Sequence, residues 1–245
     1  MMITRVMLVA VVCLLSACID GHEEIWLEAN GSGRAEISYS LPKAAARFQG
    51  GEVGVSEMIG KFLAENPAIR LSSHHVTTEG DRIKVHVSAT FDSALDLKDF
   101  ATGPAIKKLP SSATALAGEV KIRTHGRTVD FQRRISPGSA LPGAGFLPAS
   151  NFAGRSLRYT IHLPVAPLES NATRTLNDGR TLVWDFPLAD AIRTPFTTRF
   201  VAKIPIPPWL IAVCSALLLS AAGLVFLAVR RLEKSRRIVD SPAVG

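Results

Sequence analysis

Residues 74–87 read HHVTTEGDRIKVHV, and this stretch is the strongest indication of the fold class. If Gly80 and Asp81 form a two-residue turn, the flanking segments pair as a hairpin in which Val76 lies opposite Val85. The side chains then divide between two faces, Val76, Ile83, Val85 and Val87 on one and His75, Thr77, Lys84 and His86 on the other. An apolar face backed by a polar one is typical of an antiparallel sheet that is buried on one side only.

Two further turn sequences predict strands of the same kind. The glycine-rich residues 30–33 separate alternating apolar and polar segments at residues 22–30 and 34–41. The sequence NDG at residues 177–179 precedes the strand-like segment TLVWDF and follows YTIHL. Turns of this composition between alternating segments favour hairpins.

Another hairpin is predicted to turn at residues 125–126. If residues 125 and 126 form a two-residue turn, Val120 lies opposite Phe131. The same turn also places Ile122 opposite Val129, so apolar residues meet apolar residues across the strands. The register is therefore self-consistent.

One helix is predicted over residues 52–66, where the sequence Asn66-Pro67 ends it. Its apolar residues recur at helical spacing, at Val55, Met58, Ile59, Phe62 and Leu63. Together with the hairpins, this predicts an α+β domain: a curved, mostly antiparallel sheet of about eight to ten strands with one packed helix.

The segment at residues 136–154 is rich in proline and glycine and is predicted to be irregular. It nevertheless carries large apolar residues at Leu141, Phe146, Leu147 and Phe152. Long loops of this kind are often functional, so these four side chains are candidates for a lid over a ligand or for contact with lipid headgroups. The alternative is that they plug the open end of the sheet.

Residues 1–17 have the features of an export signal: a positive charge at Arg5 and then an apolar run of about ten residues. That run is too short to span a bilayer. The sequence LSAC at residues 15–18 resembles the bacterial lipobox, in which the cysteine thiol is acylated before cleavage. Cys18 is therefore predicted to be a lipidated N-terminus carrying acyl chains such as palmitate.

Residues 207–229 are long and apolar enough for a single transmembrane helix. A basic tail at residues 230–245 follows, and the positive-inside rule predicts that it is cytoplasmic. Residues 18–206 then form an extracytoplasmic domain of a bacterial cell-membrane protein, held by lipid at one end and by the helix at the other. Because much of the positive charge lies in the tail, the net charge of +7 does not indicate nucleic-acid binding.

The chain has three cysteines, and the signal, the lipidation site and the membrane helix account for Cys13, Cys18 and Cys214. The exported domain therefore has no thiol for a disulfide or for catalysis. His75 and His86, opposite each other in the hairpin, form a weak candidate metal site, because no third ligand is placed beside them. No catalytic or cofactor-binding motif is present, so we expect neither an enzyme nor a cofactor.

This layout resembles the LppM-type bacterial envelope lipoproteins. The residues that carry the resemblance are Tyr159 to Pro164, Asn171, Asp178-Gly179 and the strand Thr181 to Phe186 with Trp184. The resemblance implies a β-rich domain with an internal cavity that binds lipid or glycolipid close to a membrane, and it supplies no catalytic residues.

The sequence thus predicts a non-enzymatic, membrane-anchored envelope lipoprotein that binds a lipid or glycolipid at the membrane surface. The alternative hypothesis is a scaffold that docks another envelope protein on a solvated sheet face or strand edge. A packed interior favours the scaffold, whereas a cavity of roughly a few hundred Å³ favours the binder.

Overall fold

A computed structural model of the chain describes residues 19–47, 50–97, 111–140 and 144–205. The strands are β1 (Asp20–Leu27), β2 (Gly33–Pro42), β3 (Arg70–Glu79), β4 (Arg82–Phe91), β5 (Glu119–His125), β6 (Thr128–Ile135), β7 (Ser156–His162), β8 (Glu169–Ser170), β9 (Arg174–Leu176), β10 (Thr181–Pro187) and β11 (Phe196–Lys203). The α-helices are α2 (Lys43–Arg47), α3 (Gly51–Ala64), α6 (Ser111–Ala117), α7 (Pro137–Ala140) and α8 (Leu188–Arg193), and 3₁₀ turns lie at Ala144–Phe146 and Ala149–Phe152.

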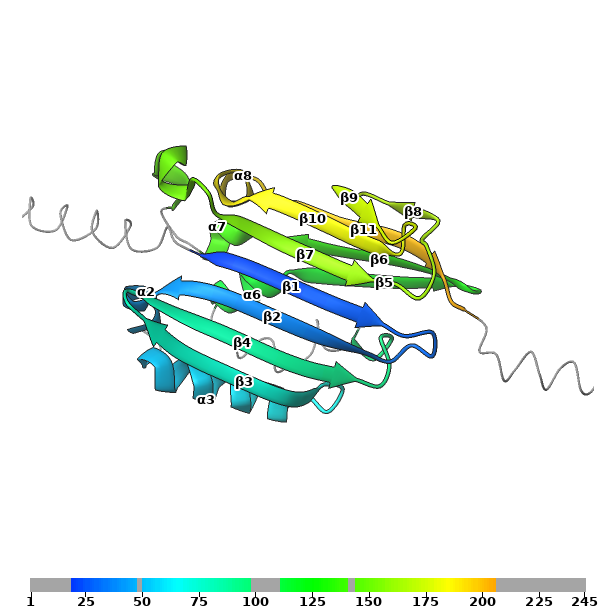
Figure 1. The fold of residues 1–245 in the computed structure, drawn as a ribbon, viewed down its shortest axis with the longest axis horizontal. Helices are drawn as coiled ribbons and strands as arrows, with labels where there is room; N and C mark the ends of the chain where they lie inside the picture. The colour runs from blue at the N-terminus through cyan, green and yellow to red at the C-terminus, as the bar shows by residue number, and fades with distance from the viewer. Residues whose placement is uncertain (1–18, 48–49, 98–110, 141–143, 206–245) are drawn as a thin grey trace, which may run out of the picture. The chain divides into compact units, whose positions relative to one another are not determined.

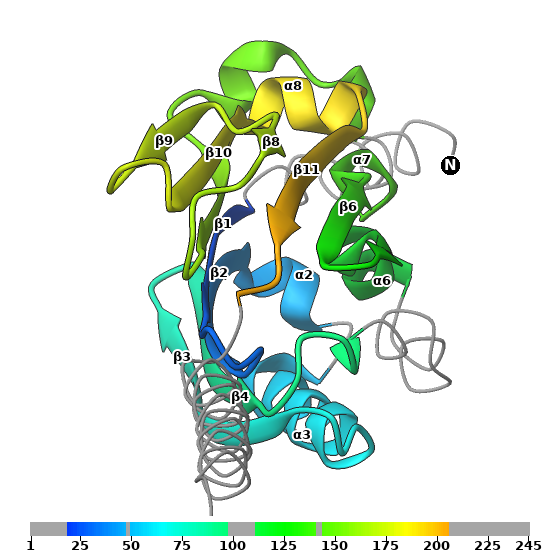
Figure 2. The ribbon, with the colours of Figure 1, turned by 90° about the vertical axis from the view of Figure 1, so that its right-hand side faces the viewer.

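The strands form two sheets (Figure 1). The large sheet has the order β3-β4-β2-β1-β7-β10-β9, and the small sheet has the order β5-β6-β11-β8. The small sheet stacks on part of the width of the large sheet, on the side of β1, β7 and β10, as the end view shows (Figure 2). The main core lies between them and includes Trp184, Leu157, Leu182, Ile135 and Phe200, all buried.

Helix α3 covers the large sheet at its β3 edge, where the helix packs on β3 (Figure 1). It forms where the apolar stripe predicted a helix, and its buried Val55 belongs to a second core with Ile83, Val85 and Val87 of β4. The Asn66 side chain donates to the Phe62 carbonyl at 2.5 Å, which satisfies one of the open carbonyl groups at the helix end. Ile59 and Leu63, half-buried, complete the contact.

The prediction of a single sheet was wrong, because β5, β6, β8 and β11 pair only with one another. The prediction of mostly antiparallel pairing is confirmed, with one exception: β1 and β7 are parallel neighbours. That pairing joins segments more than 120 residues apart in the chain, from Gly21 opposite Leu157 to Trp26 opposite His162. Alternation within a strand determines which residues face inward, but it does not determine which distant strand lies alongside.

The predicted register of residues 74–87 is confirmed: Val76 lies opposite Val85 and His75 opposite His86. Gly80 begins the turn with a φ of 61°, a conformation that favours glycine. Because the apolar side chains alternate in phase on both strands, this turn fixes the buried face of β3 and β4.

The predicted register of the hairpin between β5 and β6 was wrong by two residues. The turn residues are Gly126 and Arg127, so Ile122 lies opposite Phe131 and His125 opposite Thr128. Gly126 has a φ of 58°, as the first position of a two-residue hairpin turn requires, and this sets the turn one residue later than the sequence HG suggested. A shift of two residues keeps every side chain on its face, so the inward and outward sets are unchanged.

The irregular segment predicted at residues 136–154 contains α7 and both 3₁₀ turns. Phe152 is only 1% exposed and belongs to the main core, and Leu147 packs partly buried against the same core. Phe146 is 95% exposed, and Leu141 lies outside the described residues. Phe152 and Leu147 therefore pack into the core, as expected if the segment plugs the open end of the sheet, and a contact of this segment with ligand or lipid stays a prediction.

Several predictions lie outside the described residues: the signal at residues 1–17, the lipidation site Cys18, the membrane helix at 207–229 and the tail at 230–245. Within the ranges that the structure describes, no helix is both long and apolar enough to cross a membrane.

The described chain enters and leaves the domain at opposite ends (Figure 1). Because β7 is parallel to β1 and β10 is antiparallel to β7, β10 finishes at the end where β1 begins. Helix α8 follows at once and returns the chain along β11. The start of β1 at Asp20 and the finish of β11 at Lys203 are thus separated by a strand length, about 26 Å for eight residues.

Candidate binding site between the two sheets

A buried ion pair joins the two sheets. The Glu23 carboxylate of β1 accepts two hydrogen bonds from the Arg133 guanidinium of β6, at 2.5 Å and 3.1 Å. Both side chains are largely shielded from water, with 9% and 13% of their surface exposed. This is a bidentate ion pair, and its geometry is specific because both carboxylate oxygens and both terminal guanidinium nitrogens take part.

The pair is completed by groups from two other elements. The Tyr39 hydroxyl of β2 donates to Glu23 at 2.5 Å. Arg133 also donates to the carbonyl groups of Leu116 and Ala117, at 3.1 Å and 2.7 Å, where α6 ends. The carbonyl groups at a helix end carry partial negative charge and no partner within the helix, so a cation is stabilised there. Arg133 therefore fastens β1, β6 and α6 together.

A cavity of about 20 Å³ lies beside this ion pair. This is far below the few hundred Å³ that would favour a ligand binder, so by that criterion the closed interior is packed and favours the scaffold hypothesis. The walls of the cavity combine the ion pair with apolar and hydroxyl side chains: Glu23, Ile25, Phe131, Arg133, Tyr159, Thr160, Ile161 and Thr198. The Tyr159 hydroxyl is buried and makes no hydrogen bond of normal geometry to any described residue, although the Tyr39 hydroxyl is close enough to lower its pKa. Leaving a buried hydroxyl unpaired costs about 1–3 kcal/mol, and among the described residues the Tyr159 hydroxyl is the buried side-chain group without such a partner.

The surroundings of Arg133, Tyr39 and Tyr159 determine the protonation state of each group. Burial alone lowers the pKa of Arg133, but the charge of Glu23 and the hydrogen bonds to it raise that pKa above its ordinary value. Burial raises the pKa of Tyr159, and the charge of Glu23 raises it further. The same two causes raise the pKa of Tyr39. Both tyrosines are therefore neutral, and Arg133 is charged, across the physiological pH range.

One long side of the stacked sheets is closed by the chain itself. Asn171 stands there between β8 and β9, where it accepts hydrogen bonds from the indole nitrogen of Trp184 at 2.8 Å and the backbone nitrogen of Arg199 at 2.7 Å. It also donates to the Thr197 carbonyl at 2.8 Å. Asn171 thus ties β10 of the large sheet to β11 of the small sheet. On the other side, β1 and β6 are joined by the Glu23–Arg133 pair.

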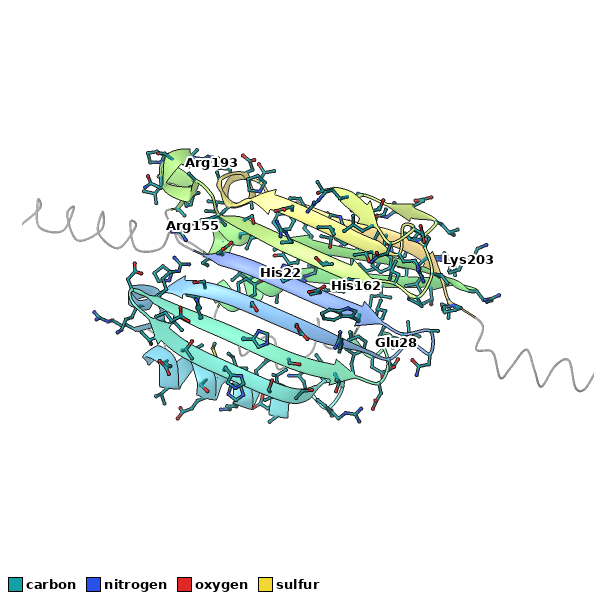
Figure 3. All side chains as sticks on the ribbon, viewed as in Figure 1. His22, Glu28, Arg155, His162, Arg193 and Lys203 are labelled. Atoms are coloured by element: carbon teal, nitrogen blue, oxygen red, sulfur yellow. The ribbon has the colours of Figure 1, made fainter. Side chains whose placement is uncertain are left out.

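The outer face of the large sheet holds a second polar cluster. Glu24 of β1 lies between His162 of β7, at 2.7 Å, and His22 of its own strand, at 3.4 Å. Figure 3 shows both histidines on that face of the neighbouring strands. Burial raises the pKa of Glu24, but the hydrogen bonds and charges of His162 and His22 outweigh it and lower the pKa below its ordinary value.

A stack of three side chains runs beside Glu24, one from each of β2, β1 and β7. The Arg34 guanidinium lies 4.0 Å from the Trp26 ring centre, and the His162 ring lies parallel to Trp26 at 5.1 Å. Cation–π and stacking contacts of this kind order side chains that would otherwise be mobile on a solvated face. The outer face therefore has a defined shape at this point.

The candidate metal ligands His75 and His86 lie on the same outer face, opposite each other as predicted. His86 is held by the Ser38 hydroxyl at 2.9 Å, and the nearby Glu79 is paired with Lys84 at 2.5 Å. Within the described ranges, His, Cys, Asp and Glu residues nowhere gather in threes in a way suited to a metal. The two histidines are thus not brought together with a third ligand.

Glu23 and Arg133 were not identified from the sequence, although a signal is present. Glu23 is in phase with the inward-facing Ile25, and Arg133 is in phase with the inward-facing Phe131. A charged residue at an inward-facing position of a strand needs a partner, because an unpaired buried charge is strongly unfavourable. When one acidic and one basic residue both occupy inward-facing positions, each is therefore the expected partner of the other.

Comparisons with protein-family models and with curated protein sequences found no match. Among solved structures, the chain is similar to the folded domain of the Mycobacterium tuberculosis LppM protein, determined by NMR. The two share 16% sequence identity at a TM-score of 0.46, and the similarity covers 77% of this chain and 91% of that one.

Proposed function

We propose that this chain is a non-enzymatic lipoprotein of the bacterial envelope, anchored at both ends in one membrane, whose exported domain binds a lipid or glycolipid between its two sheets. The lipobox at residues 15–18 and the apolar segment at residues 207–229 support the anchoring. The observation that carries the binding proposal is the cavity beside Glu23 and Arg133, where apolar walls surround the unpaired Tyr159 hydroxyl.

The arrangement suits an amphipathic ligand. Ile25, Phe131 and Ile161 offer apolar surface to a hydrocarbon chain. Tyr159 offers a hydroxyl to a polar group such as an ester or a sugar, and that contact would remove the cost of an unpaired hydroxyl. Apolar walls with a few fixed polar groups are the usual composition of small-molecule sites.

The size of the cavity limits how a ligand enters. About 20 Å³ is room for roughly one water molecule, whereas pockets for small molecules measure roughly 300–1,000 Å³. Lipid binding therefore requires the sheets to move apart. Side chains alone join β1 to β6, so parting there breaks the Glu23–Arg133 contact and no strand pairing. Asn171 and the connections around β8 would act as the hinge.

The test uses the full-length protein, purified in detergent, delipidated and exposed to an extract of envelope lipids. Mass spectrometry of the protein after gel filtration should show a retained lipid at a fixed stoichiometry. A matched variant, Ile161→Trp, fills the cavity and should retain much less. Equal retention by the two proteins, or retention by neither, would show that the space between the sheets is not a lipid site.

A second candidate function is a scaffold that docks another envelope protein, and two observations favour it. The interior is nearly filled, and the outer face of the large sheet presents the ordered stack of Arg34, Trp26 and His162. Arginine and tryptophan are frequent anchors of protein interfaces. Cross-linking in intact cells with a photoreactive residue at position 36, on that face, would trap a protein partner if this function holds and trap none if it does not.

A further inference from the structure

We propose that the domain lies lengthwise on the membrane and that the outer face of the small sheet rests on anionic phospholipid headgroups. The inference rests on the anchoring in the proposed function and adds the surface, the orientation and the class of lipid. It does not depend on a ligand between the sheets.

The two tethers that join the domain to its predicted anchors are short. Cys18, the predicted lipid attachment, precedes the first strand residue Asp20 by two positions, a reach of at most about 7 Å. Pro207, where the predicted membrane helix begins, follows Ile204 by three positions, a reach of at most about 11 Å. Asp20 and Lys203 lie at opposite ends of the strands, about 26 Å apart along β1. A domain standing on one end would leave the other anchor out of reach of the bilayer.

Charged side chains are unevenly distributed over the sides that a lengthwise domain can present to the membrane. On the small sheet, six cations face outward or stand at the turn, and three carboxylates accompany them: Lys121, Arg123, Arg127, Arg134, Arg199 and Lys203, against Glu119, Asp130 and Glu169. The outer face of the large sheet is nearly balanced: Arg34, Arg70, Arg82, Lys84, Arg158 and Arg174, against Asp20, Glu24, Glu36, Glu79 and Asp185. The exposed side of α3 is acidic, with Glu52, Glu57 and Lys61.

Several cations of the small sheet are available to bind lipid headgroups. Arg199 is paired with Asp130 at 3.1 Å and Lys121 with Glu119 at 3.0 Å. Arg123, Arg134 and Lys203 are exposed, and none has a carboxylate of the described residues within ion-pair distance. Unpaired lysine and arginine side chains attract anionic lipid headgroups, and this attraction decays within a Debye length, so only a surface in contact benefits.

The end of the small sheet is also fixed beside the chain that leads to the membrane segment. The backbone nitrogen of Ile204 donates to the Arg127 carbonyl at 2.7 Å, and the Arg127 guanidinium donates to the Ile204 carbonyl at 2.8 Å. Figure 3 shows Lys203 at this end of β11. The cationic hairpin tip is therefore held within a few residues of position 207. These contacts place cations of the small sheet beside one of the two anchors, and the excess of cations on its outer face favours this sheet over the large one as the membrane surface.

The experiment places one fluorescent probe on each outer face of the full-length protein, in a Cys214→Ser background with Cys18 kept for lipidation. Gln132→Cys, exposed on β6, reports on the small sheet, and Thr77→Cys, exposed on β3, reports on the large sheet. The protein is reconstituted in nanodiscs of phosphatidylglycerol and phosphatidylethanolamine or of phosphatidylcholine alone. Lipids with a spin-labelled headgroup quench a probe that lies at the membrane surface.

We expect quenching at position 132 to exceed that at position 77 several-fold in the anionic nanodiscs, and to fall towards the level at position 77 in phosphatidylcholine. The double variant Arg123→Glu/Lys203→Glu should remove the difference. The control Arg47→Glu/Lys61→Glu, with the same change in net charge on the α3 side, should not.

Two failures are distinguishable. If the protein is extracted from membranes by carbonate, the anchoring itself is wrong, and with it the proposed function. If the protein resists extraction but position 132 is quenched no more than position 77, or equally in both lipids, the orientation on the small sheet is overturned and the anchoring stands.

Discussion

The Glu23 carboxylate and the Arg133 guanidinium meet at 2.5 Å across the space between the two sheets, although 110 residues separate them in the chain. This contact is the main polar connection between β1 and β6, and the cavity lies against it. It fastens the side of the domain through which a ligand would enter.

Replacing Arg133 with methionine should lower the free energy of unfolding by about 3–5 kcal/mol, because Glu23 would remain buried without its partner. The double variant Glu23→Gln/Arg133→Met should recover a substantial part of that loss, because no uncompensated charge remains. Urea unfolding of the full-length protein in detergent, followed by far-ultraviolet circular dichroism, measures both. Equal stability of the single and double variants would show that Glu23 is not held by this pair.

The loop at residues 136–154 offers a matched pair of phenylalanines. Phe152→Ala should cost about 3–5 kcal/mol, because its side chain is 1% exposed and its removal leaves a cavity in the core. Phe146→Ala should change stability by less than about 0.5 kcal/mol, because that side chain is 95% exposed. Thermal unfolding of the two variants side by side checks this. A large loss for Phe146→Ala would show that this side chain packs against the domain.

Asn171→Ala should destabilise the domain by about 1–3 kcal/mol, because it leaves the buried indole nitrogen of Trp184 without an acceptor. The emission of Trp184 should change at the same time, since its polar contact is lost. Gln132→Ala is the control, because Gln132 is exposed on the small sheet. If both variants unfold at the same urea concentration as the parent, Asn171 does not connect the sheets.

The stability contributed by Glu24 should depend on pH. Its pKa is lowered in the folded protein, so its contribution is fully present above the ordinary value of 4.5 and is lost as the pH falls through the lowered pKa. Glu24→Gln should therefore be less stable than the parent at pH 7, with a difference that shrinks below about pH 4. Unfolding midpoints at pH 3, 5 and 7 test this. A difference at pH 3 as large as the difference at pH 5 would contradict the contacts with His22 and His162.

Local alternation was sufficient to predict the faces of the strands. The register of residues 74–87 followed from a two-residue turn at Gly80 and Asp81, because both strands then place their apolar residues on one side. The same reasoning misplaced the turn at Gly126 by one residue. When a turn can begin at either of two adjacent residues, the two alternatives differ by two residues in the strand pairing. Each side chain then stays on the same face of the sheet, but its partner on the other strand changes.

Contacts between distant segments could not be predicted in this way. Neither the division into two sheets nor the parallel pairing of β1 with β7 leaves a periodic signal in either strand. The site depends on these contacts, because Glu23 reaches Arg133 only when the small sheet stacks on β1. The two charged residues at inward-facing positions indicate a buried ion pair. They identify the two residues of the pair, but they do not predict how the strands are arranged.

The most direct test of lipid binding between the sheets is photo-crosslinking of the full-length protein in bilayers that contain a phospholipid with a diazirine in its acyl chain, followed by peptide mass spectrometry. The proposal predicts crosslinks to the residues that line the cavity, among them Ile25, Phe131 and Ile161, and their loss when Ile161→Trp fills that space. Crosslinks confined to residues 207–229 and to outward-facing side chains of the domain would contradict it.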